Sequence, residues 1–313
     1  MSSDPSALPA TAPDPVACAR QRRRLVRQHE IPWLNEEVAR RLDSKLEWIK
    51  LQPTSWVEWA PQWGGGAALV AARYPQALHG RLDPFAPAAA AVPSGSGGFQ
   101  ALKASLKQWW AGQPARVWQL DDVQDAPWAE TGAQMLWANM SLHTGTDLPG
   151  LVRHWHRQLA PQGFLMCSAL GPDTARELRA LYARHGWGLP TVDFIDMHDL
   201  GDELSKAGFA DPVMDMERIQ LTWASPEAML AELRTWGGNV ASGRFAGCRG
   251  RGWQRAWLKA VGDELTDADG RVRLTVELIY GHAIKPEPRA PMQPETTVSL
   301  QDMRRMIRGR GQP

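Results

Sequence analysis

The chain has 313 residues, of which 43% are hydrophobic, and a formal net charge of +1. This length and apolar share are enough for one large domain with a buried core. A net charge so close to zero gives no global field that would attract nucleic acid or a membrane surface, so neither is expected as a partner.

Cysteine use and hydropathy indicate where such a protein works. The three cysteines, Cys18, Cys167 and Cys248, lie far apart, so they predict neither a disulfide framework nor a paired metal motif. No apolar run approaches the roughly 20 residues that span a bilayer, and the N-terminus lacks the basic-then-apolar order of a signal peptide. We expect a soluble, cytoplasmic protein with a disordered segment at residues 1–20 and a flexible tail at residues 287–313.

Helices and strands alternate in the first half of the chain. Apolar residues recur at helical spacing between residues 32 and 51, which predicts an amphipathic helix. A strand at 55–59, a glycine-containing loop at 60–66 and a helix at 67–73 form the first strand–loop–helix unit. Such alternation predicts a parallel α/β sheet. The next predicted strands are 78–82, 115–120, 133–138 and 164–170, with helices at 101–111 and 148–159.

The second half of the chain mixes helices with two long strands. Ser225 followed by Pro226 and Glu227 predicts a capped helix start. A loop rich in glycine and arginine follows at 243–252. The predicted helices are 174–185, 200–207, 226–236 and 253–262, and the predicted strands are 212–222 and 271–283.

The most informative stretch, Trp137-Ala-Asn-Met-Ser-Leu-His143, joins a buried strand to the next helix. A loop at the carboxyl end of a parallel strand is where α/β sheets place their ligand sites. With Gly171–Leu178, Asp211–Glu217 and Ile279–Ala283, this stretch resembles the class I S-adenosylmethionine-dependent methyltransferases. Within them it is similar to the BioC-type malonyl-[acyl-carrier protein] O-methyltransferases of biotin synthesis.

The resemblance runs from about Glu37 to Pro286 and implies a Rossmann-like α/β fold. We expect a seven-stranded, mostly parallel sheet with helices on both faces, in one methyltransferase-like domain over residues 21–286. Helical segments within that domain would cap the substrate site.

The resemblance also implies S-adenosylmethionine as the cofactor. In the family, the first strand ends in an acidic residue followed by Gly-x-Gly-x-Gly, because the backbone must approach the cofactor without Cβ atoms in the way. Glu58 falls on the acidic position, and the three glycine positions are Ala60, Gln62 and Gly64. Two of the three glycines are therefore replaced.

Three further positions match cofactor-binding positions of the family. Asp83 matches the acid that binds both ribose hydroxyls, Asp122 the acid that meets the adenine amino group, and Asn139 the asparagine after the fourth strand. We expect Asp83 and Asp122 to converge on one nucleoside-sized hollow floored by Gly64. His143 is a candidate catalytic residue that contacts the substrate, the alternative being an exposed loop histidine.

The implied methyl acceptor is a malonyl group on acyl carrier protein or on coenzyme A. A carboxylate is already a competent nucleophile, so such an enzyme mainly supplies proximity and orientation. An arginine that holds the malonyl carboxylate would be the natural requirement. Four arginines in or beside the 243–252 loop could dock an acidic carrier protein by charge complementarity, although a solvated loop explains them equally well. These are Arg244, Arg249, Arg251 and Arg255.

Metal chemistry is not expected. His154 and His156 are two residues apart on a helix and face different directions, so they predict no metal pair. The acidic residues Asp193, Asp196 and Asp199 around His198 are typical of a helix start.

Two functions remain open at this point. The first is an active, S-adenosylmethionine-dependent O-methyltransferase of the malonyl-carrier-protein type. The second is a catalytically silent methyltransferase-like paralogue that serves as a binding or regulatory protein. Ala60, Gln62 and Gln134, which replace family residues, favour the second, as does the absence of tyrosine from residues 25–33.

Overall fold

A single sheet organises the chain. The computed structural model describes residues 9–28, 30–84, 117–119, 123–142 and 146–288. Seven strands form one sheet in the order β3-β2-β1-β4-β5-β7-β6. All neighbouring pairs are parallel except those made by β7, which runs antiparallel to both β5 and β6. This confirms the predicted Rossmann-like α/β sheet. The strands are β1 (Ser55–Trp59), β2 (Leu78–Asp83), β3 (Val117–Gln119), β4 (Ala133–Ala138), β5 (Leu159–Leu170), β6 (Ala210–Trp223) and β7 (Val272–Ile284).

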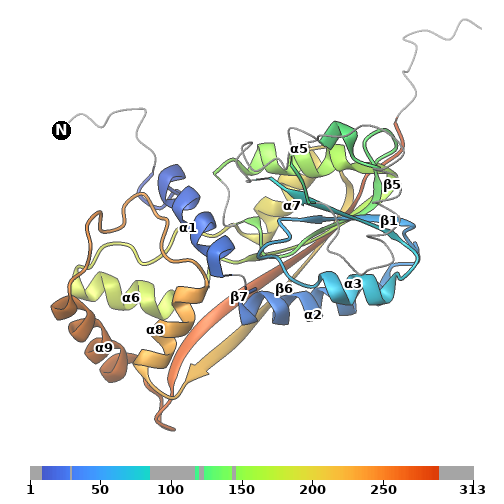
Figure 1. Cartoon of the computed structure of the whole chain (residues 1–313). Helices are drawn as coiled ribbons and strands as arrows, with labels where there is room; N and C mark the ends of the chain where they lie inside the picture. The colour runs from blue at the N-terminus through green and yellow to red at the C-terminus, as the bar shows by residue number, and fades with distance from the viewer. Residues whose placement is uncertain (1–8, 29, 85–116, 120–122, 143–145, 289–313) are drawn as a thin grey trace, which may run out of the picture.

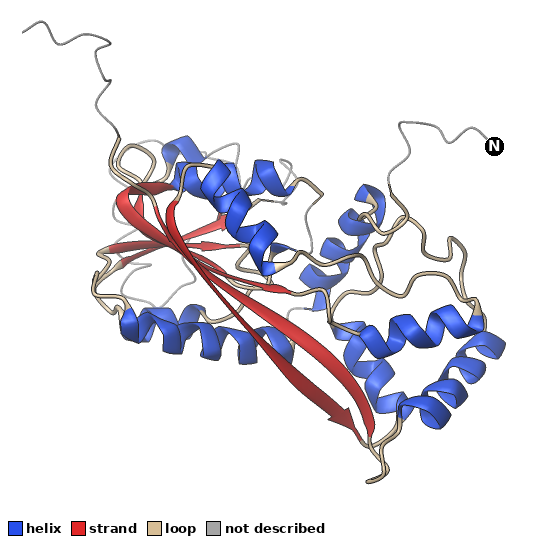
Figure 2. Cartoon of the chain, turned by 180° about the vertical axis from the view of Figure 1, so that it is seen from behind, coloured by secondary structure: helices blue, strands red, loops and turns tan. Residues whose placement is uncertain are grey.

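Helices cover both faces of the sheet (Figures 1 and 2). Because successive side chains of a strand point to opposite faces, β1 contributes Trp56 to one core cluster and Val57 to the other. The Trp56 cluster is covered by α2 (Trp33–Lys45) and α3 (Ala67–Arg73), and the Val57 cluster by α5 (Leu148–Gln158) and α7 (Met197–Lys206).

Three further helices form a cap at one end of the molecule (Figure 2). They are α6 (Arg176–His185), α8 (Pro226–Thr235) and α9 (Arg251–Leu265). The cap has its own core, in which Leu178 and Trp257 pack with Leu274 of β7. The long ribbon of β6 and β7 therefore belongs to both the sheet and the cap.

The N-terminal segment differs from the expectation of disorder over residues 1–20. Helix α1 (Pro15–Gln28) begins inside that segment and lies between the sheet and the cap (Figure 1). Ala17, Cys18, Gln21 and Leu25 are buried and share one helix face. Residues 1–8 and 289–313 lie outside the described residues, as does the helix expected at 101–111. No described helix is long and apolar enough to cross a membrane.

Strand β5 also begins earlier than expected. Residues Ala160–Gly163, in which a Pro-Gln-Gly sequence predicts a turn, continue the strand. The amide of Gln162 donates to the carbonyl of Lys285 at 2.7 Å, and the amide of Lys285 donates to Gly163 at 2.8 Å. Pairing with a segment more than a hundred residues away therefore overrides the local turn signal.

Candidate functional site

The loop that follows β1 folds back on itself. Ala60 has a φ of +55°, in the left-handed region, which costs a residue with a Cβ about 1–2 kcal/mol. The backbone amides of Trp63 and Gly64 both donate to the Ala60 carbonyl, at 3.3 and 3.1 Å. These two amides, which a phosphate- or carboxylate-binding loop would present to its ligand, are thus satisfied within the loop.

Asn139 fastens this loop to its neighbours. Its fully buried side-chain amide donates to the carbonyls of Gly64 and, at 2.8 Å, of Asn35 on α2. The hydroxyl of Ser168 on β5 donates to the Asn139 Oδ1 atom at 2.6 Å. A Cβ atom on Gly64 would lie 3.1 Å from the Asn139 carbonyl oxygen. The structure therefore brings Gly64 and Asn139 together, and both serve the architecture of the loop.

Asp83, at the end of β2, is 2% exposed. The Gln62 side chain reaches it from the loop, and Gln62 Nε2 donates to Asp83 Oδ2 at 2.7 Å. Burial lowers the pKa of the Arg22 guanidinium on α1, and the charge of Asp83 counters that effect. The carboxylate expected to bind ribose is thus occupied by a neighbouring amide and lies within electrostatic reach of a cation.

Glu58 is paired with the next strand of the sheet. Its side chain is 1% exposed, and its Oε2 atom lies 3.3 Å from both Arg81 Nε and His79 Nε2 on β2. The His79 ring stacks on Trp56, with 3.7 Å between ring centroids. Of the other expected site residues, Asp122 and His143 lie outside the described residues.

A small cavity lies on one side of the loop. This cavity of about 20 Å³ lies between Trp63, Asn35, Met140 and five apolar neighbours, which leaves room for about one water molecule. S-adenosylmethionine contains a nucleoside and an amino acid, so it is much larger than this cavity.

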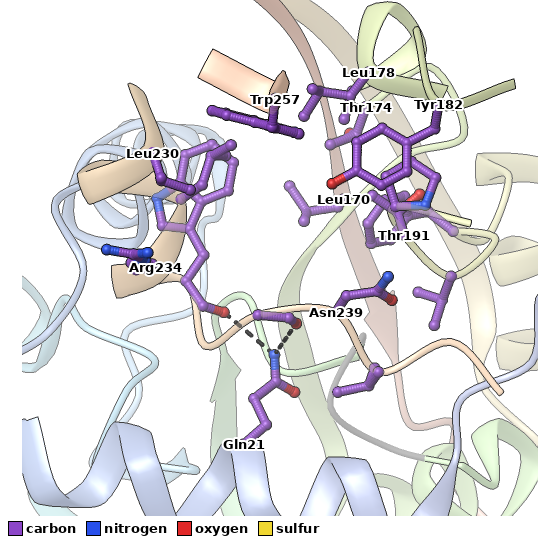
Figure 3. Close-up of a pocket in the computed structure, with 18 of the residues that line it drawn as sticks. Gln21, Leu170, Thr174, Leu178, Tyr182, Thr191, Leu230, Arg234, Asn239 and Trp257 are labelled. Carbon is purple, nitrogen blue, oxygen red and sulfur yellow. Dashed lines mark hydrogen bonds between the residues drawn. The ribbon is translucent and has the colours of Figure 1, made fainter. Parts of the chain in front are cut away.

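A larger cavity, of about 250 Å³, lies between the end of β5, α1 and the three cap helices (Figure 3). Its lining is mostly apolar and includes Leu178, Leu230 and Trp257. The Tyr182 hydroxyl points into it, and burial raises the pKa of that hydroxyl. Size and lining are those of a site for an apolar or extended ligand.

Polar groups of this cavity are only partly satisfied. Gln21 of α1 donates to the carbonyls of Trp236 and Gly238 at 3.3 and 3.2 Å (Figure 3). Its Oε1 atom and the Thr191 hydroxyl are buried and have no hydrogen-bond partner in the described part of the chain. Arg234 also lines the cavity, with an exposed side chain that pairs with no described acid. No sequence pattern indicates these residues, because they come from separate elements.

The two cavities share two wall residues, Leu170 and Trp236. Leu170 is the last residue of β5, and Trp236 follows α8. A ligand that extends through the larger cavity to these side chains would therefore end next to the loop after β1.

The segment Gly171–Leu178 connects the sheet to the cap. Thr174 Oγ1 donates to the carbonyl of Glu277 and accepts from its amide, each at 3.1 Å. The carboxylate of Glu177 accepts hydrogen bonds from both the amide and the hydroxyl of Thr275. These bonds fix the start of α6 to β7 and give this segment a structural role.

One of the acidic residues near α7, Asp196, also has a structural role. Asp196 caps the helix, and its carboxylate accepts from the amide and the ring of His198, both at 2.8 Å. Within the described residues, no group of three or more His, Cys, Asp and Glu side chains could hold a metal ion.

Curated proteins of one kind match most of this chain. It is 37% identical over 258 residues to the malonyl-[acyl-carrier protein] O-methyltransferase of Laribacter hongkongensis, covering 82% of this chain and 84% of that protein. The protein of the same name from Gallionella capsiferriformans is 36% identical over 261 residues, with 82% and 85% covered. The chain belongs to the malonyl-[acyl-carrier protein] O-methyltransferase family.

Other comparisons add little to this assignment. No family model matches the chain. The crystal structure of the YcgJ protein from Bacillus subtilis aligns with a TM-score of 0.48 and 12% identity, covering 79% of this chain and 98% of that one. In this member of the malonyl-[acyl-carrier protein] O-methyltransferase family, the Gln62 side chain donates to Asp83, the acid expected to hold the ribose.

Proposed function

We propose that this chain transfers a methyl group to the free carboxylate of a malonyl thioester carried by an acyl carrier protein. The observation that carries the proposal is the match to proteins of that name along 82% of the chain. S-adenosylmethionine is the methyl donor that the family implies. The comparisons give no support to the catalytically silent alternative. We also propose malonyl-CoA as a second methyl acceptor. A cytoplasmic location is part of the same proposal.

The cavity under the cap is the proposed acceptor site. It adjoins the loop after β1 through Leu170 and Trp236, so an acyl group held there would face the donor side of the sheet. The Tyr182 and Thr191 hydroxyls can hydrogen-bond an amide-containing thioester arm. Arg234 supplies a cation for a carboxylate or phosphate. Orientation of the acceptor is the main contribution that such a transfer needs.

Two arginines of α9, Arg251 and Arg255, are the proposed contacts for the carrier protein. The other two arginines of this region have intramolecular partners: Arg244 pairs with Asp14 at 2.8 Å, and Arg249 lies over two aromatic rings. Arg251 and Arg255 are exposed and form no ion pair with any described residue. They are available to an acidic partner.

The proposal is tested by incubating the full chain with S-adenosylmethionine and malonyl-loaded carrier protein and following the acyl mass. We expect the gain of one methyl group on the malonyl carrier and none on the acetyl carrier. Malonyl-CoA in a parallel reaction reports whether the carrier is needed. Absence of methyl ester on both malonyl thioesters, at donor concentrations that saturate the protein, would contradict the proposed activity.

The carrier surface has its own test. The double substitution Arg251→Glu and Arg255→Glu is expected to raise the KM for malonyl carrier protein about 3- to 10-fold, as loss of exposed charge pairs does. The KM for malonyl-CoA should stay unchanged. Lys206→Glu, a charge reversal on α7, is the control. Equal KM values for the double variant and this control would exclude Arg251 and Arg255 as carrier contacts.

A further inference from the structure

The most unusual contact of the candidate site joins Gln62 to Asp83. Gln62 stands at a position where the family pattern has glycine, and its Nε2 atom donates to Asp83 Oδ2 at 2.7 Å. The expected partners of Asp83 are ribose hydroxyls, which are also hydrogen-bond donors. We propose that the Gln62 side chain competes with the methyl donor for the Asp83 carboxylate and thereby weakens donor binding.

The rest of the loop supports this closed arrangement. Trp63 is 2% exposed and its carbonyl accepts from Asn35 Nδ2 at 2.6 Å, which ties the loop to α2. The amides of Trp63 and Gly64 turn inward to Ala60. A donor molecule must therefore displace the Gln62 amide to reach the Asp83 Oδ2 atom.

The contact is incomplete, so it can open. Gln62 Oε1 is buried without a hydrogen-bond partner among the described residues. A buried acceptor without a partner is unfavourable, which offsets part of what the bond to Asp83 contributes and makes displacement of the Gln62 side chain easier. Competition with a charge-assisted hydrogen bond of this kind weakens a ligand about 10- to 100-fold.

The experiment measures binding of S-adenosylhomocysteine, the demethylated donor, to the full chain by isothermal titration calorimetry. Gln62→Ala removes the competing amide, and we expect it to bind 10- to 100-fold more tightly than the unsubstituted chain. Gln162→Ala is the matched control, because Gln162 Nε2 also donates to a carboxylate, that of Glu287 at 2.9 Å. Its affinity should equal that of the unsubstituted chain.

The proposal is overturned if Gln62→Ala and the unsubstituted chain bind equally, whether both bind at low micromolar concentration or neither binds at millimolar concentration. Thermal unfolding of each variant checks that it folds. If Gln62→Ala does not fold, the double substitution Ala60→Gly and Gln62→Gly, which restores the family glycines, replaces it with the same expected gain.

The inference relies on the proposed function only for the identity of the donor. Tighter binding by Gln62→Ala without methyl transfer to malonyl carrier protein would leave the inference standing and remove the proposed acceptor. Methyl transfer with no effect of Gln62→Ala on binding would support the proposed acceptor and overturn the inference about Gln62.

Discussion

At the residue scale, polar side chains near the candidate site bind the protein itself. The Asn139 amide holds two backbone carbonyls, and the Asp83 carboxylate holds Gln62. Glu58 is paired with Arg81 and His79. The sequence therefore predicts that these residues lie near strand ends. It does not predict their hydrogen-bond partners, because matching positions to a family pattern does not show which side chains are neighbours in space.

Asn139→Asp should destabilise the fold. At neutral pH, the substitution replaces an amide that donates to Asn35 and Gly64 with a buried carboxylate facing their carbonyl oxygens. We expect a loss of about 3 kcal/mol in the free energy of unfolding, measured with urea. Ser168→Ala, which removes one hydrogen bond to Asn139, should cost about 1 kcal/mol. If Asn139→Asp lowers the free energy of unfolding no more than Ser168→Ala does, the Asn139 amide does not stabilise the loop after β1.

The cysteines should differ in reactivity. Burial raises the pKa of the Cys167 thiol to about 12, and burial also raises the pKa of Cys18, whereas Cys248 is exposed. Because the thiolate is the reactive form, iodoacetamide at pH 8 should modify Cys248 in the folded protein. Cys18 and Cys167 should react only after unfolding. Peptide mapping checks this, and modification of Cys167 in the folded chain would contradict its burial.

At the scale of elements, local sequence patterns predicted the bounds of a helix or strand correctly where a buried segment lies between turn residues. The strand 55–59, the helix 67–73 and the strand 133–138 have the predicted bounds because each is an apolar run between turn residues. Helix α1 was missed because its arginines obscure the apolar face, on which Ala17 and Cys18 pack against Val240. The early start of β5 depends on Lys285, which no local pattern indicates. The cap cavity, built from several elements, could not be predicted from sequence for the same reason.

The junction of β5, α6 and β7 should tolerate no added volume. A Cβ atom on Gly171 would lie 2.7 Å from atoms of the Glu277 side chain, which is 3% exposed. Gly171→Ala is therefore expected to lower the free energy of unfolding by about 1–3 kcal/mol and to speed hydrogen exchange in α6. Gly252→Ala, where an added Cβ meets nothing within 4 Å, is the control and should be neutral or slightly stabilising. Similar losses for both would exclude this steric explanation.

At the scale of the whole molecule, partly buried histidines and paired carboxylates make stability depend on pH in one direction. Burial is the main factor that lowers the pKa of His154, His156 and His282. The unfolded chain therefore binds more protons than the folded chain as the pH falls through about 6.5. A hydrogen bond from Lys45 lowers the pKa of Asp215, so this carboxylate loses its contribution at lower pH still.

The free energy of unfolding should thus fall steadily from pH 7.5 to pH 5. Urea titrations at half-unit intervals measure the slope. His282→Gln, which removes a half-buried titrating ring, should reduce the slope between about pH 6.5 and pH 5. His198→Gln is the control, since that ring is exposed at the surface. Constant or rising stability on acidification would contradict the assigned effect of partial burial on these histidines.

The shared ribbon restricts how the cap can move. Residues 278–284 of β7 pair with both β5 and β6, whereas residues 272–277 pair with β6 alone and extend beneath the cap helices. No flexible hinge separates the sheet from the cap along these strands. The cap therefore cannot rotate away from the sheet as a rigid body. The cap helices thus keep their distance from the end of β5, and the cavity between them is a permanent feature of the fold.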